Sequence, residues 1–245
     1  MAIEVFNRYE HKYLLTEAVC KKVIKVMDSY MVLDKYNQNH KPYTISNIYY
    51  DTPDDYLIRQ SLSKPLYKEK LRLRAYGVPH RNDTVFLEIK KKYNGIVNKR
   101  RSALMLEDAY SFIADGKIAD IRSYMNEQVI KEITYFLSFY MPVPKLYLAY
   151  DRIAYFEKGN ADLRISFDKN IRSRRYNLRL ENGDYGDALL GKGLCLMEIK
   201  TSLAKPLWLT NMLTEFNIKR SSFSKYGTEF RQFINTAPQI QKSAV

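Results

Sequence analysis

Apolar and charged residues alternate along positions 68–101 with the period of two that an extended strand gives to its side chains. In the first predicted strand, one face carries Lys70, Arg72 and Arg74, and the opposite face carries Leu71, Leu73 and Ala75. Asn82 and Asp83 mark a turn, and the alternation then resumes with Val85, Leu87 and Ile89 on the apolar side. After the turn signal Asn94-Gly95, a third strand is expected from Ile96 to Ser102. This segment therefore predicts three successive antiparallel strands.

The rest of the chain repeats the same kind of strand and adds amphipathic helices. Further strands are expected at 5–14, 45–50, 145–154, 163–168 and 194–200. Helices are expected from the N-cap Thr16, from Pro53, and over 107–115, 120–140 and 206–216, with a last one beginning within 221–226. The segment 177–193 is expected to be a loop with a short helical turn, and the residues after about Thr236 a frayed tail. No linker divides the chain, so a single α+β domain over residues 1–245 is predicted, with about eight antiparallel strands and helices packed outside.

Composition adds a charge to this picture. The 245 residues are 46% hydrophobic, enough for a substantial core, and 40 Lys plus Arg stand against 27 Asp plus Glu, a formal net charge of +13. The excess implies an anionic partner without choosing among nucleic acid, a membrane surface and phosphate metabolites. No apolar run is long enough to span a bilayer and the start lacks a signal-peptide pattern, so a cytoplasmic location is expected. Cys20 and Cys195 match no metal or redox spacing and are expected to be core thiols.

The orientation of the charged faces is the open question. A solvated polar face on an antiparallel sheet is common, but three cations at alternate positions of one strand repel one another unless an anion lies along them. If the charges face inward and the helices cover the outside, the sheet encloses a channel for a polyanion. Carboxylates repeatedly accompany the cations, as Glu88 accompanies Lys90 and Glu198 accompanies Lys200. Because a carboxylate repels phosphate unless it binds a divalent cation, this mixture suits a metal–phosphate complex.

Eight short motifs in this order are similar to those of a known family. They are Arg8-x-Glu10-x-Lys12, Tyr49-Tyr50-Asp51-Thr52, Lys70-x-Arg72-x-Arg74, Glu88-x-Lys90, Tyr150-x-Arg152, Arg164-x-Ser166-x-Asp168, Glu198-x-Lys200 and Phe223-Ser224-Lys225-Tyr226. Over about residues 4–234 the chain resembles the VTC domain of polyphosphate polymerases, of the standalone bacterial type, within the triphosphate tunnel metalloenzyme superfamily that also contains the CYTH phosphatases. Ser222 departs from the pattern, because some eukaryotic members carry a basic residue there.

The resemblance implies an eight-stranded antiparallel β-barrel tunnel with a charged interior, and it implies roles for particular residues. The catalytic set would be Lys12, Arg72, Arg74, Lys90, Arg152, Arg164 and Glu198. Further phosphate contacts would come from Arg8, Lys70, Lys99, Arg101, Lys200, Ser224 and Lys225, the last two near a helix start where free N–H groups favour anions. Glu198, with help from Glu88, would bind Mn²⁺ or Mg²⁺.

The implied activity is phosphoryl transfer, in which the metal and the arginines neutralise charge on the γ-phosphoryl group. The expected ligands are ATP or another triphosphate, and polyphosphate. A phosphate acceptor would give chain growth and water would give triphosphate hydrolysis, and the sequence leaves both open. An alternative of another class is a non-catalytic module that binds polyphosphate or nucleic acid by charge and stacking, although such a module has no use for Glu198 and Glu88. The duller alternative for the arginines is surface salt bridging.

Overall fold

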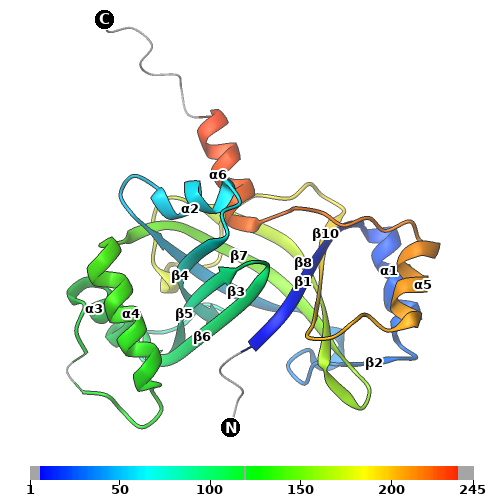
Figure 1. Ribbon diagram of the computed structural model, residues 1–245, viewed down its shortest axis with the longest axis horizontal. Coiled ribbons are helices and arrows are strands. Elements are labelled where there is room, and N and C mark those ends of the chain that lie inside the picture. The colour runs from blue at the N-terminus through cyan, green and yellow to red at the C-terminus, as the bar shows by residue number, and fades with distance from the viewer. Residues whose placement is uncertain (1–5, 119, 237–245) are drawn as a thin grey trace, which may run out of the picture.

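The computed structural model describes residues 6–118 and 120–236 and has an α+β fold with one antiparallel sheet (Figure 1). The strands are β1 (Phe6–Thr16), β2 (Met31–Leu33), β3 (Tyr43–Asp51), β4 (Tyr67–Tyr76), β5 (Thr84–Tyr93), β6 (Ile96–Met105), β7 (Val143–Glu157), β8 (Asn160–Arg174), β9 (Asp187–Ala188) and β10 (Leu194–Thr201). The α-helices are α1 (Glu17–Met27), α2 (Tyr56–Leu62), α3 (Leu106–Asp115), α4 (Glu127–Tyr140), α5 (Leu207–Glu215) and α6 (Lys225–Thr236). The α+β class and the antiparallel strands predicted from the alternation are confirmed.

Strand pairing brings the charged positions of neighbouring strands together. The hydrogen-bonded order is β2-β7-β3-β4-β5-β6-β1-β10-β8-β9, and β7 also pairs with β8. Residues directly opposite each other in an antiparallel pair point to the same face. Lys12 lies opposite Glu198, and Lys70 lies opposite Lys90. The charged faces that the sequence defined strand by strand thus lie on one side of the sheet, where β3 contributes the uncharged Ile45, Asn47 and Tyr49 between β7 and β4.

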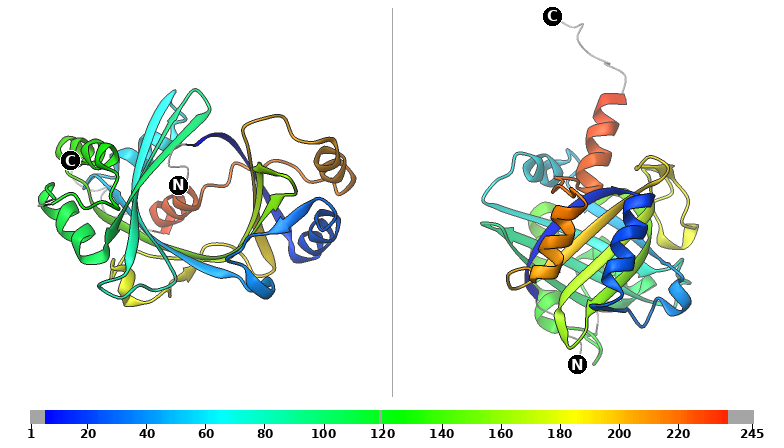
Figure 2. Two further views of the ribbon diagram at one scale, coloured as in Figure 1. Left: turned by 90° about the horizontal axis from the view of Figure 1, so that it is seen from below. Right: turned by 90° about the vertical axis from the view of Figure 1, so that its right-hand side faces the viewer.

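Helices cover the other face of the sheet (Figure 2), and two apolar cores lie beneath them. In the first, Leu73 of β4 is fully buried beneath Phe112 of α3 and Ile133 of α4. In the second, Val23 of α1 and Leu209 of α5 cover the strands around β10. Burying an apolar side chain of this size stabilises the fold by about 1.5–3 kcal/mol, so these contacts hold the helices against this face. The helix-covered face is therefore the outer face of the sheet. The charged face is left on the inside.

A third core joins α2 and α6 to the sheet and positions the start of α6. Asp51, at the end of β3, is fully buried, and its Oδ2 accepts hydrogen bonds from the Ile58 backbone N–H at 2.9 Å and from the Tyr226 hydroxyl at 3.1 Å. Its Oδ1 accepts from the Leu57 N–H at 2.8 Å. The carboxylate therefore satisfies free N–H groups of α2 and anchors the first turn of α6 at once.

Several boundaries differ from those expected. α4 begins at Glu127 rather than 120, because the Asn126 side chain accepts from the Val129 N–H at 3.0 Å and supplies the cap. α2 begins at Tyr56 rather than at Pro53. β2 and β9 were not expected, since three and two residues are too short for a period to be visible. The predicted frayed tail after Thr236 lies outside the described residues.

The cysteines agree with expectation in their burial but not in their pairing. Cys20 of α1 and Cys195 of β10 were expected to be core thiols; both are buried in the second core, where the structure joins them in a disulfide across 175 residues of sequence. Sequence spacing gave no sign of this contact, because it depends on α1 packing over β10. No helix within the described ranges has both the length and the apolar character required to cross a bilayer.

Candidate functional site

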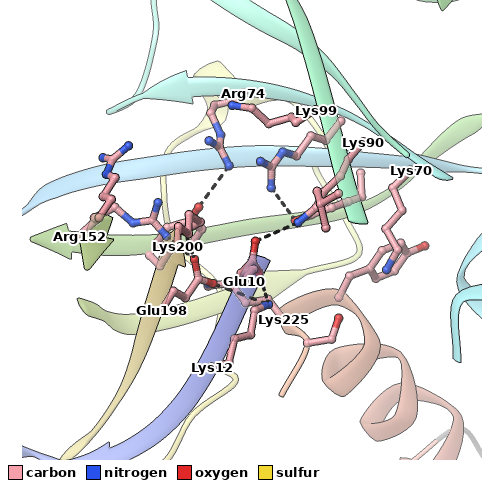
Figure 3. Close-up of a pocket in the computed structure, with 17 residues that line it drawn as sticks. Glu10, Lys12, Lys70, Arg74, Lys90, Lys99, Arg152, Glu198, Lys200 and Lys225 are labelled. Carbon is pink, nitrogen blue, oxygen red and sulfur yellow. Dashed lines mark hydrogen bonds and ion pairs between the residues drawn. The ribbon is translucent and has the colours of Figure 1, made fainter. Parts of the chain in front are cut away.

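The inward charged face surrounds a cavity of about 230 Å³ (Figure 3). Among the described residues that line it, ten are basic and two are acidic. The basic ones are Lys12, Lys70, Arg72, Arg74, Lys90, Lys99, Arg152, Arg164, Lys200 and Lys225, and the acidic ones are Glu10 and Glu198. Tyr49, Val97, Tyr150, Ser224 and Tyr226 complete the lining. A buried surface with such an imbalance of charge is suited to hold an anion with several charges.

Glu88 organises the wall formed by β4, β5 and β6. Arg72 Nη2 lies 2.7 Å from its carboxylate, Lys99 Nζ lies at 3.4 Å and Arg74 Nη1 at 3.7 Å. The Glu88 side chain is 1% exposed. Burial alone would raise its pKa, but Arg74 and Arg72 outweigh burial and hold the pKa of Glu88 well below its usual value. Glu88 is thus a charged counter-ion that fixes the direction of two arginines.

Glu198 has the corresponding place on the β1 and β10 wall. Its carboxylate contacts Lys200 at 2.7 Å, Lys225 at 3.0 Å, Arg152 at 3.2 Å and Lys12 at 3.7 Å. Burial would raise its pKa, and Lys200 and Lys225, followed by the other two cations, hold the pKa of Glu198 well below its usual value. The carboxylate is therefore ionised and shared among four basic groups from three strands and a helix.

Asp168 lies fully buried behind this cluster. Arg152 donates to it from Nε at 2.6 Å and from Nη2 at 2.7 Å, and Lys225 Nζ lies 2.5 Å away. Burial would lower the pKa of Lys225, but Asp168 and Glu198 outweigh burial and raise it. Since Lys225 is the first residue of α6, the charge cluster and the Tyr226–Asp51 contact together hold that helix start at the cavity.

Glu10 connects the two walls. It accepts from Lys90 Nζ at 3.1 Å, and Lys12 Nζ lies 3.2 Å from its other oxygen. Because Lys12 also contacts Glu198, the carboxylates of Glu10 and Glu198 approach one cation from two strands. Figure 3 shows both carboxylates directed toward the centre of the cavity.

Lys70 differs from the other lining cations. Within the described parts of the chain, no carboxylate lies at ion-pair distance from its Nζ, which is 5.5 Å from the centre of the Tyr226 ring. Burial, followed by repulsion from Lys90, Lys68 and Lys12, lowers the pKa of Lys70 to about 7. An anion entering the cavity would stabilise its charged form.

The structure brings most of the predicted site residues together. Those that line the cavity are Lys12, Lys70, Arg72, Arg74, Lys90, Lys99, Arg152, Arg164, Glu198, Lys200, Ser224 and Lys225. Glu88 lies just behind the lining, and Arg101 stands outside it with its guanidinium 4.5 Å from the Phe86 ring centre. The side chain of Arg8 lies outside what the structure describes.

Sequence reasoning did not assign Glu10, Asp168 and Tyr226 to the site, although each is part of a motif quoted above. Their roles depend on contacts with residues that are far away in the sequence, such as Glu10 with Lys90 and Asp168 with Lys225. The available signal was their position, since each shares a strand face or a helix turn with a predicted phosphate-binding residue.

The carboxylates provide a partial set of metal ligands. No group of three or more His, Cys, Asp or Glu side chains placed to hold a metal occurs in the described residues. Mg²⁺ and similar ions commonly use one or two carboxylates together with substrate phosphates, and Glu198 with Glu10 fits that donor set. Glu88, predicted as a helper ligand, is absent from the cavity lining and its side chain is 1% exposed, which suits a counter-ion better.

Comparison with known proteins gives a family and a fold. A family model described as the VTC domain matches residues 7–234. A Bacillus halodurans protein provisionally named an adenylate cyclase is similar in structure, with a TM-score of 0.55 and 14% identity over 91% of this chain and 96% of its own. A Vibrio parahaemolyticus protein of the same provisional name has a TM-score of 0.46 and 13% identity over 91% and 98%. The Mimivirus capping enzyme triphosphatase has a TM-score of 0.35 and 9% identity over 88% and 89%. No curated protein matches the sequence.

Proposed function

This chain belongs to the VTC domain family, and from that premise we propose that it transfers the γ-phosphoryl group of a triphosphate held in a basic tunnel, most specifically from ATP to a polyphosphate end. The observation that carries the proposal is the convergence of ten basic groups and two carboxylates on one cavity, with Glu88 and Asp168 behind the lining. Such a density of buried cations is costly without a ligand that neutralises it.

The pairing of strands supports a tunnel within one domain. From β7 the ladders run through β3, β4, β5, β6, β1, β10 and β8, and β8 pairs with β7 again. Eight antiparallel strands connected in this way surround the charged face, with β2 and β9 as short additions. A wall of this kind allows cations to approach a phosphate chain from all sides.

The carboxylates distinguish this site from one that only binds nucleic acid. In a module that holds a polyanion by charge alone, Glu10 and Glu198 inside the groove would repel phosphate and weaken binding. In the proposed enzyme, Glu198 with Glu10 holds Mn²⁺ or Mg²⁺, which supplies neutralisation of charge on phosphate oxygens. In the free protein these carboxylates keep Lys12, Arg152 and Lys225 in position.

The residues of the chain have separate tasks in the proposed reaction. Arg72 and Arg74, both fixed by Glu88, hold the oxygens of the transferred group from one wall. Arg152 and Lys225, both fixed by Asp168, hold them from the opposite wall. Binding between two rigid walls aligns the attacking and leaving oxygens, and little covalent work is required of the protein.

Family membership favours a phosphate acceptor over water. The ten lining cations are offset by Glu10 and Glu198 in the lining and by three carboxylates behind it, Glu88, Asp168 and Asp34. The remaining excess of about five positive charges suits a triphosphate.

The test is ³¹P NMR of the products formed from ATP with Mn²⁺ or Mg²⁺. Chain synthesis gives resonances of internal phosphates together with ADP, whereas hydrolysis gives only ADP and orthophosphate. Arg72→Ala should abolish turnover while the protein stays folded. Arg100→Ala is the matched control. Arg100 is also a strand arginine paired with a glutamate, but its partner is Glu132 of α4, away from the cavity. If orthophosphate forms without polymer, the activity is hydrolysis and not synthesis. Wild-type turnover in Arg72→Ala would refute the assignment of the cavity as the active site.

A further inference from the structure

Four aromatic side chains continue the inward face of the sheet beyond its cations. They are Tyr43 of β3, Tyr76 of β4, Phe86 of β5 and Phe156 of β7, here called the aromatic rim. Phe86 lies opposite Arg74, Tyr43 opposite Arg152, and Phe156 opposite Arg164. Since opposite residues share a face, the rim points to the same side as arginines that line the cavity. Tyr76 also does so, because it follows Arg74 by two positions on β4.

All four residues lie at one end of the barrel wall. Tyr43 begins β3 and Tyr76 ends β4, while Phe86 stands near the start of β5 and Phe156 near the end of β7. Because these strands are antiparallel neighbours in the order β7-β3-β4-β5, their starts and ends alternate along the same edge. The opposite end is the one where α6 begins, beside Asp51 at the end of β3.

Contacts connect the rim into one surface. The ring centres of Tyr43 and Tyr76 are 5.9 Å apart, and those of Tyr76 and Phe86 are also 5.9 Å apart, with the second pair edge to face. Arg164 joins the remaining ring, since its Nη2 donates to the Tyr43 hydroxyl at 3.4 Å and its guanidinium lies 5.0 Å from the centre of Phe156. Arg101 lies over Phe86 at 4.5 Å.

The rim is not used by the packing of the protein. Tyr76 is 51% exposed, and the other three rings are half-buried. In the described part of the chain, Tyr76, Phe86 and Phe156 belong to none of the three apolar cores, and only Tyr43 packs against one. Aromatic surface left open beside guanidinium groups, at the edge of a phosphate-sized cavity, indicates a ligand that has both a π-system and phosphates.

From this arrangement we infer that the aromatic rim stacks the base of a nucleoside triphosphate whose phosphates occupy the cavity. The inference rests on the proposed function and extends it, because it adds a base subsite and sets the direction of the nucleotide. The base lies at the rim, the phosphates pass Arg164, and the terminal phosphate lies between Arg72 and Arg74 on one wall and Arg152 and Lys225 on the other.

The chemistry of the rim also predicts how selective it is. Stacking on a ring tolerates any base, and the main polar group of the rim, the Tyr43 hydroxyl, is already engaged by Arg164. We therefore expect purine nucleoside triphosphates to bind better than pyrimidine ones, in proportion to ring area, with little distinction between adenine and guanine. Inorganic tripolyphosphate should bind in the same cavity without using the rim.

The test compares ATP with tripolyphosphate, by isothermal titration calorimetry without divalent metal, so that no turnover is needed. Tyr76→Ala should weaken ATP binding about tenfold, the usual loss for one stacked ring, and leave the affinity for tripolyphosphate unchanged. Tyr76→Trp should restore ATP binding. Tyr135→Ala is the control, because Tyr135 is a 68% exposed tyrosine of α4 outside the cavity.

A second measurement does not depend on any variant. Saturation-transfer NMR on the wild-type protein should label the H8 and H2 protons of ATP more strongly than its ribose protons. Equal loss of ATP and tripolyphosphate affinity in Tyr76→Ala, or no loss of either, would overturn the base subsite, as would absence of saturation at the base protons. Tight tripolyphosphate binding with no base contact would leave the proposed function intact. Base stacking without turnover of ATP under any metal would instead refute the proposed function alone.

Discussion

Replacing Glu198 by glutamine removes one negative charge from the cavity while nearly keeping the volume of the side chain. Glu198 contacts four cations, but Arg152 and Lys225 retain Asp168, and Lys12 retains Glu10. Lys200 alone loses the carboxylate it contacts. Breaking a buried ion pair costs about 3–5 kcal/mol, and because three of the four cations stay paired, we expect a loss of about 3 kcal/mol in the free protein. For a chain of this length that corresponds to a fall of about 10 °C in Tm.

The same substitution should affect two ligands in opposite directions. Without Glu198 the lining keeps ten cations and one carboxylate, so tripolyphosphate should bind more tightly in the absence of metal. Turnover of ATP with Mn²⁺ should fall by a factor of about 100 or more, because the metal loses its main carboxylate. Tripolyphosphate should also restore Tm by more in Glu198→Gln than in the wild-type protein.

The assay combines thermal unfolding by circular dichroism, tripolyphosphate titration with and without Mn²⁺, and ADP release. Glu132→Gln is the matched control, since Glu132 also accepts from two cations, Lys91 and Arg100, but lies outside the cavity. It should lose some stability and keep full turnover. Wild-type turnover in Glu198→Gln, or weaker metal-free binding of tripolyphosphate, would show that this carboxylate neither holds the metal nor competes with phosphate.

Three further outcomes are expected. Burial and neighbouring lysines lower the pKa of Lys70 to about 7, and burial also lowers the pKa of Lys99 to about 7 and that of Lys200 to about 8. Binding of an anion should draw protons to these groups, so tripolyphosphate affinity should fall as pH rises above about 7, and less steeply in Lys70→Arg; a flat profile in wild type, or an equally steep one in Lys70→Arg, would contradict this. Asp51→Ala should destabilise the protein by about 2–4 kcal/mol in urea unfolding, because it leaves two α2 N–H groups and the Tyr226 hydroxyl without their acceptor; a loss under about 1 kcal/mol would show that water replaces the carboxylate. EDTA should stop turnover of ATP while tripolyphosphate binding persists, whereas turnover that survives chelation would remove the need for a metal.

Which side of each strand faces an apolar core could be predicted from the sequence, because it depends only on local periodicity. Leu71 and Leu73 on one side of a strand and Lys70 and Arg72 on the other define two faces without reference to any other residue. The helix cap at Thr16 could be predicted for the same reason, because its side chain accepts a hydrogen bond from the backbone N–H of Val19, only three residues further along the chain. The order of motifs, compared with the VTC domain, then indicated most of the residues that line the cavity.

Contacts between distant strands were beyond such reasoning. Glu88 was predicted as a helper metal ligand, and only the register of β4, β5 and β6 shows that Arg72, Arg74 and Lys99 surround its carboxylate. Arg101 was predicted to hold phosphate, and only the packing of β5 places it over Phe86 beyond the cations. A period of two specifies which residues share a face, but not which residue of another strand they meet.

By itself the sequence determined that the strands have a basic side and an apolar side, that helices cover an apolar surface, and that an anion is the natural partner. The same alternation of apolar and charged residues fits a sheet with a charged exterior and a sheet with a charged interior. The pattern alone could therefore not decide which way the basic side points. The tertiary structure decided that, because α1, α3, α4 and α5 bury the apolar side and the charged side lines the cavity. Apolar surface becomes buried only when helices pack against the assembled sheet, so the sequence of a single strand does not specify which of its faces is covered.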